Sequence, residues 1–374
     1  MKKRKILAIV FVGLLLCSCG KEPSFSSTTK NELTSSDAPS STTSFVSSNK
    51  ETLNDFSGTE ASKSFASRGY EALYKDINFK NGFILSKTST NAEGGSQYKE
   101  YLKYYEETKS YKPFWSLGQW GTRHNLYNNY TLTHSEDGFI YGYTALSGKT
   151  LGNTFIPAKR VQFNSKTGEI DLELNAETEY DAPRKKQERW PHLLLGQSFS
   201  DNLIHIASSR SIVMEAEFEI TKFEDKTLSL ADPSLHAAQL VWYITLQNRN
   251  KSSDNYGSYV WLGVPLWDNR KIGKETELFA QLDTGTSSLM YNSSTREYYS
   301  QFNDSKMPLI HQKAKATFEV VKAARIAYDY AISHGYLGST KFEDLYIGAT
   351  NFGFEVSGLY NIGVHIDNIG VYYK

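Results

Sequence analysis

Three carboxylates stand at alternate positions of one short segment: Glu169, Asp171 and Glu173. Successive side chains of a β-strand point to opposite faces, so all three would lie on one face of a strand. Paired carboxylates can hydrolyse glycosidic bonds when the carboxyl groups are about 5–5.5 Å apart. Positions i and i+4 of a flat strand are roughly 13 Å apart, so a strongly concave sheet would be needed. The alternative is an amphipathic strand that shows its charged face to water.

This E-x-D-x-E pattern resembles the signature of the family 16 glycoside hydrolases, jelly-roll enzymes that cleave β-glucans and galactans. The resemblance implies that Glu169 is the nucleophile, that Asp171 assists and that Glu173 is the acid/base. The chain departs from the family just upstream, where residues 156–160 replace the usual tryptophan-rich segment.

A histidine, a tyrosine and an arginine form a second candidate for chemistry. His192 as base and Tyr180 as acid could perform β-elimination on a uronic-acid polysaccharide, with Arg184 neutralising the carboxylate. Because three leucines follow His192, the alternative is a buried histidine whose hydrogen bonds are satisfied.

All six tryptophans fall between residues 115 and 267. Indole combines a flat apolar face with a polar handle, so it can stack on sugar rings while neighbouring polar groups bind the hydroxyls. The alternative is packing in the core or at a sheet edge, above all for Trp115, Trp242 and Trp261. The candidate sugar-binding residues are Trp115, Gln119, Trp120, Arg184, Trp261, Trp267, Asp268 and Arg270.

Metal and cofactor chemistry have little support in the sequence. The eight histidines form neither His-x-His nor His-Glu-x-x-His, and those are the spacings typical of zinc sites. The chain also lacks a Gly-rich phosphate loop and a Gly-x-Ser-x-Gly elbow. We expect no metal ligands and no cofactor. Loop oxygens could hold a structural calcium ion, although no calcium-binding loop is recognisable.

Strand patterns must position these residues. Apolar and polar side chains alternate over 211–222, 168–175 and 239–247, and turn residues separate these runs. Six further strands are expected at 81–86, 138–144, 257–266, 276–283, 342–349 and 361–373. Helical spacing covers 319–334, followed by a capping glycine, and more weakly 62–75.

Many evenly spaced strands with little helix predict a mainly β fold, an antiparallel jelly-roll-like β-sandwich with one or two short helices. Roughly the last 30 residues resemble the closing strands of jelly-roll, concanavalin-A-like domains of carbohydrate-active proteins.

The N-terminal region predicts where the protein is located. A basic start, Met1 to Lys5, precedes an apolar run of about eleven residues, well short of the roughly 20 that span a membrane. The run ends in Leu16-Cys17-Ser18-Cys19, which resembles the bacterial lipobox. The resemblance implies cleavage before Cys19 and lipid on its thiol and new N-terminus. We therefore expect an exported protein on the outer face of the cytoplasmic membrane or in a Gram-negative envelope.

Ser and Thr fill 15 of the 27 positions from 24 to 50, a composition that cannot bury enough apolar surface to order itself. The expected organisation is a signal peptide over 1–18, a lipidated tether over 19–66 and the β-sandwich over 67–374. Residues 17 and 19 are the only cysteines, which excludes an internal disulfide or a Cys-ligated zinc in the mature chain.

The balance of basic and acidic residues limits the classes of partner that we expect. The chain has 41 basic and 41 acidic residues and no basic block after the signal, so nucleic acid is not an expected partner. Contact with membrane is expected through the lipid alone. The leading hypothesis is an anchored lipoprotein that binds a polysaccharide or oligosaccharide through an aromatic groove. The alternatives are a glycoside hydrolase or lyase of the same fold and a structural or adhesive envelope protein, so enzymatic activity stays open.

Overall fold

The computed structural model describes residues 59–86, 99–102, 113–126, 130–200, 203–227, 230–283 and 286–374. Cys19, the predicted signal peptide and most of the predicted tether lie outside these residues. Among the described helices, none is long and apolar enough to cross a membrane.

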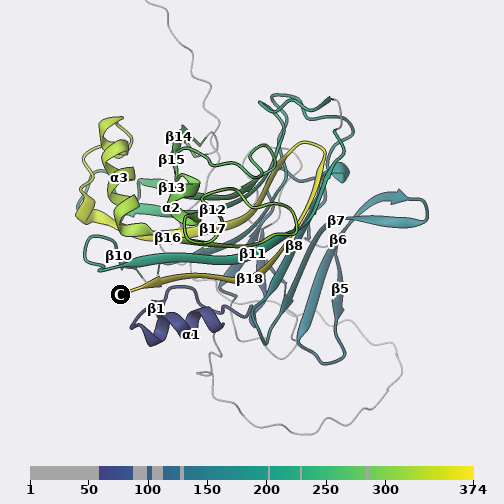
Figure 1. Ribbon diagram of the computed structural model, residues 1–374, viewed down its shortest axis with the longest axis horizontal. Helices are drawn as coiled ribbons and strands as arrows, with labels where there is room; N and C mark the ends of the chain where they lie inside the picture. Colours follow the sequence, from purple (N-terminus) through teal and green to yellow (C-terminus); the bar gives the residue numbers. More distant parts are fainter. Residues whose placement is uncertain are drawn as a thin grey trace, which may run out of the picture.

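Two β-sheets form a sandwich, as the sequence predicted (Figure 1). Sheet A contains, in spatial order, β16 (Lys313–Glu319), β11 (Ile212–Asp225), β18 (Tyr360–Tyr373), β8 (Ile170–Asn175), β7 (Thr154–Asn164), β6 (Ile140–Leu151) and β5 (Tyr130–His134), with β1 (Glu71–Ala72) also paired to β18. Sheet B contains β14 (Phe279–Leu282), β15 (Leu289–Asn292), β13 (Tyr259–Asp268), β12 (Ala237–Asn248), β17 (Leu345–Ser357), β9 (His192–Ser198), β4 (Trp115–Gly118), β2 (Phe83–Ser86) and β3 (Lys99–Leu102), with β10 (Ile204–His205) on β17. Pairing is antiparallel except at β13–β15 and β2–β4.

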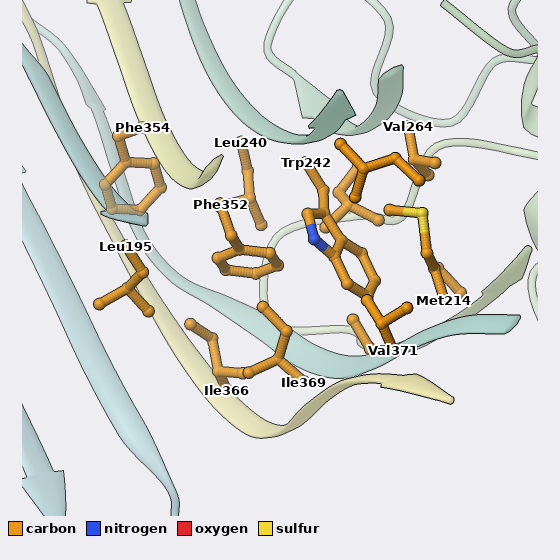
Figure 2. Close-up of a cluster of buried hydrophobic side chains, with 14 of the residues drawn as sticks. Leu195, Met214, Leu240, Trp242, Val264, Phe352, Phe354, Ile366, Ile369 and Val371 are labelled. Carbon is orange, nitrogen blue, oxygen red and sulfur yellow. The ribbon is translucent and has the colours of Figure 1, made fainter. Parts of the chain in front are cut away.

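The core fills the space between the sheets (Figure 2). Trp242 and Phe352 of sheet B are fully buried and pack edge to face, with ring centroids 5.7 Å apart. Met214 and Val371 of sheet A belong to the same cluster. The Trp242 indole N–H lies 3.0 Å from the hydroxyl of Tyr74, so its polar atom is satisfied inside the core.

Three α-helices occur in the described chain: α1 (Glu60–Ser67), α2 (Thr295–Tyr299) and α3 (Val320–Ser333). Short 3-10 turns cover Ala176–Thr178 and Phe342–Asp344. The helix expected over 319–334 is confirmed as α3, which buries Ala324 and Ala327.

α1 begins before the expected start of the domain at residue 67. The Thr59 side chain caps it by accepting from the backbone N–H of Ser62. Phe65 stacks on Tyr372 of β18 with ring centroids 3.9 Å apart, so the helix belongs to the folded unit. Its serine-rich sequence resembles the tether in composition, and its one buried residue, Phe65, is too weak a signal to separate them.

Candidate functional site

A row of polar side chains crosses one end of the outer face of sheet B. His192 of β9 pairs with Glu355 of β17, Glu355 pairs with Gln239 of β12, and Gln239 pairs with Asp268 of β13. Directly opposed residues have Cβ atoms about 4.5–5.5 Å apart and share a face. Ala238 lies in the core beside Gln239, so the row points away from the core.

The histidine of this row has a defined tautomer. Its Nδ1 lies 3.1 Å from the carbonyl oxygen of Trp120, and because a carbonyl only accepts, Nδ1 carries the proton. In the neutral ring the lone pair is then on Nε2, which lies 3.9 Å from Oε2 of Glu355. The side chains of His192 and Glu355 are 16% and 23% exposed, so both can be reached from solvent.

Two tryptophans flank the histidine. The ring of Trp120 meets His192 edge to face at 5.8 Å, and the ring of Trp190 lies 5.8 Å from it on a tilt. Trp120 is 40% exposed. The backbone N–H of His192 donates to the Trp120 carbonyl at 3.0 Å, which fixes the segment that carries the indole.

Two glycines make this arrangement possible. A Cβ on Gly118 would lie 2.8 Å from the Trp120 ring, so the indole lies over a position without a side chain. Gly121 has a φ of +68°, and a Cβ there would come within 2.1 Å of the Trp190 carbonyl oxygen. Glycine is required at 121 for both reasons.

The fourth member of the row, Asp268, is committed to an ion pair. Its Oδ2 accepts from Arg270 at 2.5 Å and from Gln239 at 2.9 Å. Its Oδ1 accepts from the backbone N–H and the Nε of Arg270, both at 2.9 Å. Asp268 and Arg270 therefore hold the rim of the row and offer little free hydrogen-bonding capacity.

Further along the outer face of sheet B the side chains become apolar. Leu194, Val241, Tyr243 and Trp261 form a cluster of their own, separate from the main core. Burial, with a contribution from the nearby Glu355 carboxylate, raises the pKa of Tyr243 well above its ordinary value. Trp261, expected to bind sugar, lies on this outer face but is only 7% exposed.

Three of the candidate sugar-binding residues lie in the interior. Trp115, Gln119 and Trp267 have no exposed surface. The indole N–H of Trp115 donates to the carbonyl of Asp76, and that of Trp267 to the carbonyl of Pro308. These residues cannot contact a ligand in this structure, and their placement in a groove was wrong: β4 and β13 turn the two tryptophans towards the core, and Gln119 is buried directly after β4.

Neither partner expected for a catalytic base at His192 is free to contact a substrate. Tyr180 is buried, which raises its pKa, and its hydroxyl donates to the carbonyl of Arg189. Arg184 is also buried; it donates to the carbonyls of Glu188 and Leu235. Its guanidinium lies 4.9 Å from the centre of the Trp190 ring, so it supports that ring and is not free to bind a uronate.

The carboxylates of the E-x-D-x-E segment lie on the outer face of sheet A. Asp171 lies 2.8 Å from His365, and Glu173 lies 2.7 Å from Lys222. Glu169 precedes β8, in the turn after β7. Two of the three carboxylates are paired with a basic side chain, and β8 is hydrogen-bonded to a strand on each side. This arrangement is the amphipathic-strand alternative, and the contacts of Glu169, Asp171 and Glu173 give no support to the catalytic roles that the resemblance implied.

Sequence reasoning missed Glu355, Gln239 and Trp190. Glu355 follows Phe354 in a stretch that resembles a closing strand, but nothing local separates it from a solvated glutamate. Only the register that pairs Glu355 with His192, 163 positions away by their residue numbers, reveals it. No group of three or more His, Cys, Asp or Glu side chains that could hold a metal occurs in the part of the chain that the structure describes.

Comparisons with known proteins give similarity in structure alone. No family model and no curated protein matches the sequence. A family 12 xyloglucanase from Bacillus licheniformis has a TM-score of 0.37 and 11% identity over 69% of this chain and all of its own. The endoglucanase cel12A from Rhodothermus marinus and a family 11 xylanase from Neocallimastix patriciarum each have a TM-score of 0.34, at 11% and 13% identity, over 66% of this chain and 96% of their own. At these values the likeness carries no argument about activity.

Proposed function

We propose that the polar end of the outer face of sheet B binds polysaccharide. We call this surface the Glu355 patch; it consists of Trp120, Trp190, His192, Gln239 and Glu355. The observation that carries the proposal is an exposed indole, Trp120, which lies over Gly118 at the edge of a row of hydrogen-bonding side chains. A flat apolar ring beside amide, carboxylate and imidazole groups matches a sugar, which has apolar C–H faces and hydroxyl edges.

Cleavage of the bound chain is a second candidate function, favoured by one observation. Nε2 of His192 faces the Glu355 carboxylate at 3.9 Å on a surface open to solvent. A histidine and a carboxylate so placed can move a proton to or from a bound substrate. The two-carboxylate mechanism of glycosidases is less well supported, because the other carboxylate of the row, Asp268, is committed to Arg270.

The test is to compare Trp120→Ala with the matched control Phe302→Ala, an exposed aromatic residue outside the patch. The probes are xyloglucan, cellulose and xylan oligosaccharides, followed by titration calorimetry and by release of reducing ends. Loss of an aromatic stacking surface costs about 1–3 kcal/mol in base stacking. We therefore expect the affinity of Trp120→Ala for these oligosaccharides to fall by about tenfold or more. The melting temperature should change little, since the ring is partly exposed.

Glu355→Gln separates the two functions. Binding without cleavage predicts no reducing-end release by the unaltered protein and a modest loss of affinity in the variant. Cleavage predicts release that the variant abolishes while binding persists. Equal binding by Trp120→Ala and the unaltered protein, or no binding of any probe, would contradict a polysaccharide function at this patch.

We propose further that the protein is an exported lipoprotein anchored through Cys19. The support is the order of a basic start, a short apolar run and the Leu-x-Ser-Cys sequence. Two acyl chains bind a membrane far more firmly than one. Cys19→Ala should therefore move the protein to the soluble fraction on cell fractionation, whereas Cys17→Ala should leave it bound; a retained Cys19→Ala variant argues against the anchor.

A further inference from the structure

The hairpin of β6 and β7 has an unusual apolar tip. The pairing of the two strands shifts register on both sides of Leu146, and beyond this irregularity the hairpin extends away from the sandwich (Figure 1). Three large apolar side chains are exposed there: Leu146 at 40%, Leu151 at 77% and Phe155 at 64%. Exposed apolar side chains that gather in one place mark binding surfaces more often than solitary ones do.

A cavity that is open to solvent over much of its extent lies at the base of this tip. Its volume is about 370 Å³, and it is lined by His124, Leu146, Ser147, Gly148 and Phe155. This volume falls within the range of small-molecule sites, roughly 300–1,000 Å³. The lining combines an exposed phenyl ring and a leucine with an imidazole, so it pairs an aromatic face with a hydrogen-bonding group, as the Glu355 patch does. The Ser147 hydroxyl serves the hairpin itself, because it donates to the carbonyl of Ile156 and accepts from the backbone N–H of Lys149.

The cavity is close to the patch. His124 follows Trp120 by four residues, so their Cα atoms can be at most about 14 Å apart. Gly121, between them, is in contact with the backbone of Trp190. One short loop therefore carries a residue of the patch at its start and a wall of the cavity at its end.

A buried ion pair fixes that loop. Glu179 accepts from the backbone N–H groups of Arg123 and His124, and the Lys159 ammonium donates to both Glu179 and the carbonyl of His124. The side chains of Lys159 and Glu179 are 0% and 1% exposed. Breaking a buried pair by removing one partner is strongly destabilising, so the loop has little freedom to move. The spacing between cavity and patch is thus set by the fold.

The charges around the cavity favour an uncharged ligand. Lys149, the one lysine of the hairpin tip, donates to the carbonyls of Glu177 and Tyr180 and is not directed at a ligand. Burial lowers the pKa of His124, which keeps its ring neutral at pH 7. An anionic membrane surface attracts clusters of exposed lysine and arginine, and this tip has none.

We propose that this cavity is a distal subsite, which binds sugar units further along the same uncharged polysaccharide chain that the Glu355 patch holds. The inference rests on the proposed function of that patch. Phe155 provides the stacking surface, while the imidazole of His124 contacts the hydroxyls.

The experiment compares chain lengths. Binding of cello- and xyloglucan oligosaccharides, from disaccharide to octasaccharide, is measured by calorimetry for the full chain and for Phe155→Ala, Phe155→Trp and Phe139→Ala. Phe139 is the control, because it is equally a phenyl ring with an exposed face, 41%, in the turn before β6. We expect Phe155→Ala to lower the affinity for long chains by about tenfold and to leave the disaccharide unaffected. Phe155→Trp should restore long-chain binding.

The outcomes separate the two levels of the proposal. If Trp120→Ala loses all chain lengths and Phe155→Ala loses none, the distal subsite is wrong and the patch stands. If Trp120→Ala also binds normally, the proposed function itself fails. A concentration-dependent dimer that Phe155→Ala converts to monomer would assign the tip to self-association and overturn the subsite.

Discussion

The two sheets present opposite kinds of outer face. On sheet A, Glu217 and Glu219 of β11 stand opposite Lys315 and Lys313 of β16. On sheet B, positions that also point away from the core carry Leu194, Val241, Tyr243 and Trp261, all of them buried. The first face pairs its charges with one another beside solvent; the second buries its apolar side chains although they lie outside the main core.

This difference separates a solvated face from one that is largely buried. A sheet that covers one core normally shows polar residues to water on its other side, and sheet A does so. Sheet B departs from that rule, and its departure ends at the polar row of the Glu355 patch. Because the same sandwich contains both faces, the apolar character of the second is not a general property of the fold.

The sharpest test of the comparison is Trp261→Ala against Glu217→Ala. Trp261 packs edge to face on Tyr243 and Tyr259 at 6.1 and 5.4 Å, so its removal should leave a cavity and cost about 3–5 kcal/mol. Glu217 has a 40% exposed side chain paired with Lys315, and such pairs contribute about 0–1 kcal/mol. Urea unfolding measures both; similar values for the two variants would remove the distinction between the faces.

A second test concerns Gly121, the glycine that lies between Trp120 and the backbone of Trp190. Gly121→Ala combines a left-handed φ of +68° with a close approach to Trp190, whereas Gly138→Ala has a φ of +72° and no neighbour within 4 Å. The control should cost about 1–2 kcal/mol from backbone strain alone, and Gly121→Ala should cost more. Only Gly121→Ala should also shift the tryptophan fluorescence and weaken oligosaccharide binding. Equal behaviour of the two variants would mean that the Trp120–Trp190 arrangement is not built on this contact.

The smallest effect is expected on sheet A. Burial alone would lower the pKa of His365, but its hydrogen bond to Asp171 and the nearby carboxylates of Asp367 and Glu169 outweigh it and raise the pKa. A raised folded-state pKa stabilises the fold below the unfolded value of about 6.5, and this contribution is lost as pH rises through the folded value.

His365 is about one-third exposed, at 32%, so screening should keep this contribution below about 1 kcal/mol. The unfolding midpoint in urea, measured on both sides of neutral pH, should fall slightly as pH rises, and His365→Gln should flatten the dependence. A midpoint that rises with pH, with a rise that His365→Gln abolishes, would contradict the assigned ion pair.

Local patterns were enough for much of the fold. The alternation over 211–222 and 168–175 predicted β11 and β8, because each of these strands has one polar and one apolar face. The spacing of apolar residues likewise predicted α3. The alternation over 239–247 also identified the face of β12 that meets the core, which carries Leu240, Trp242, Ile244 and Leu246. The pattern did not show that the opposite face, with Val241 and Tyr243, is buried as well.

The orientation of the tryptophans on β13 could not be predicted from local alternation. Trp261 and Trp267 are six residues apart, and alternation would place them on the same face of β13. A bulge opposite Leu240 and Val241 shifts the register by one residue, so Trp261 points outward and Trp267 enters the core.

Strand periods, the main helix and the expected export signal can be read from local stretches of the chain. Tertiary structure decided which tryptophan meets solvent, and it decided that His192 faces Glu355. Strand order and register bring distant residues together, and they depend on the pairing of whole sheets, which no local pattern contains.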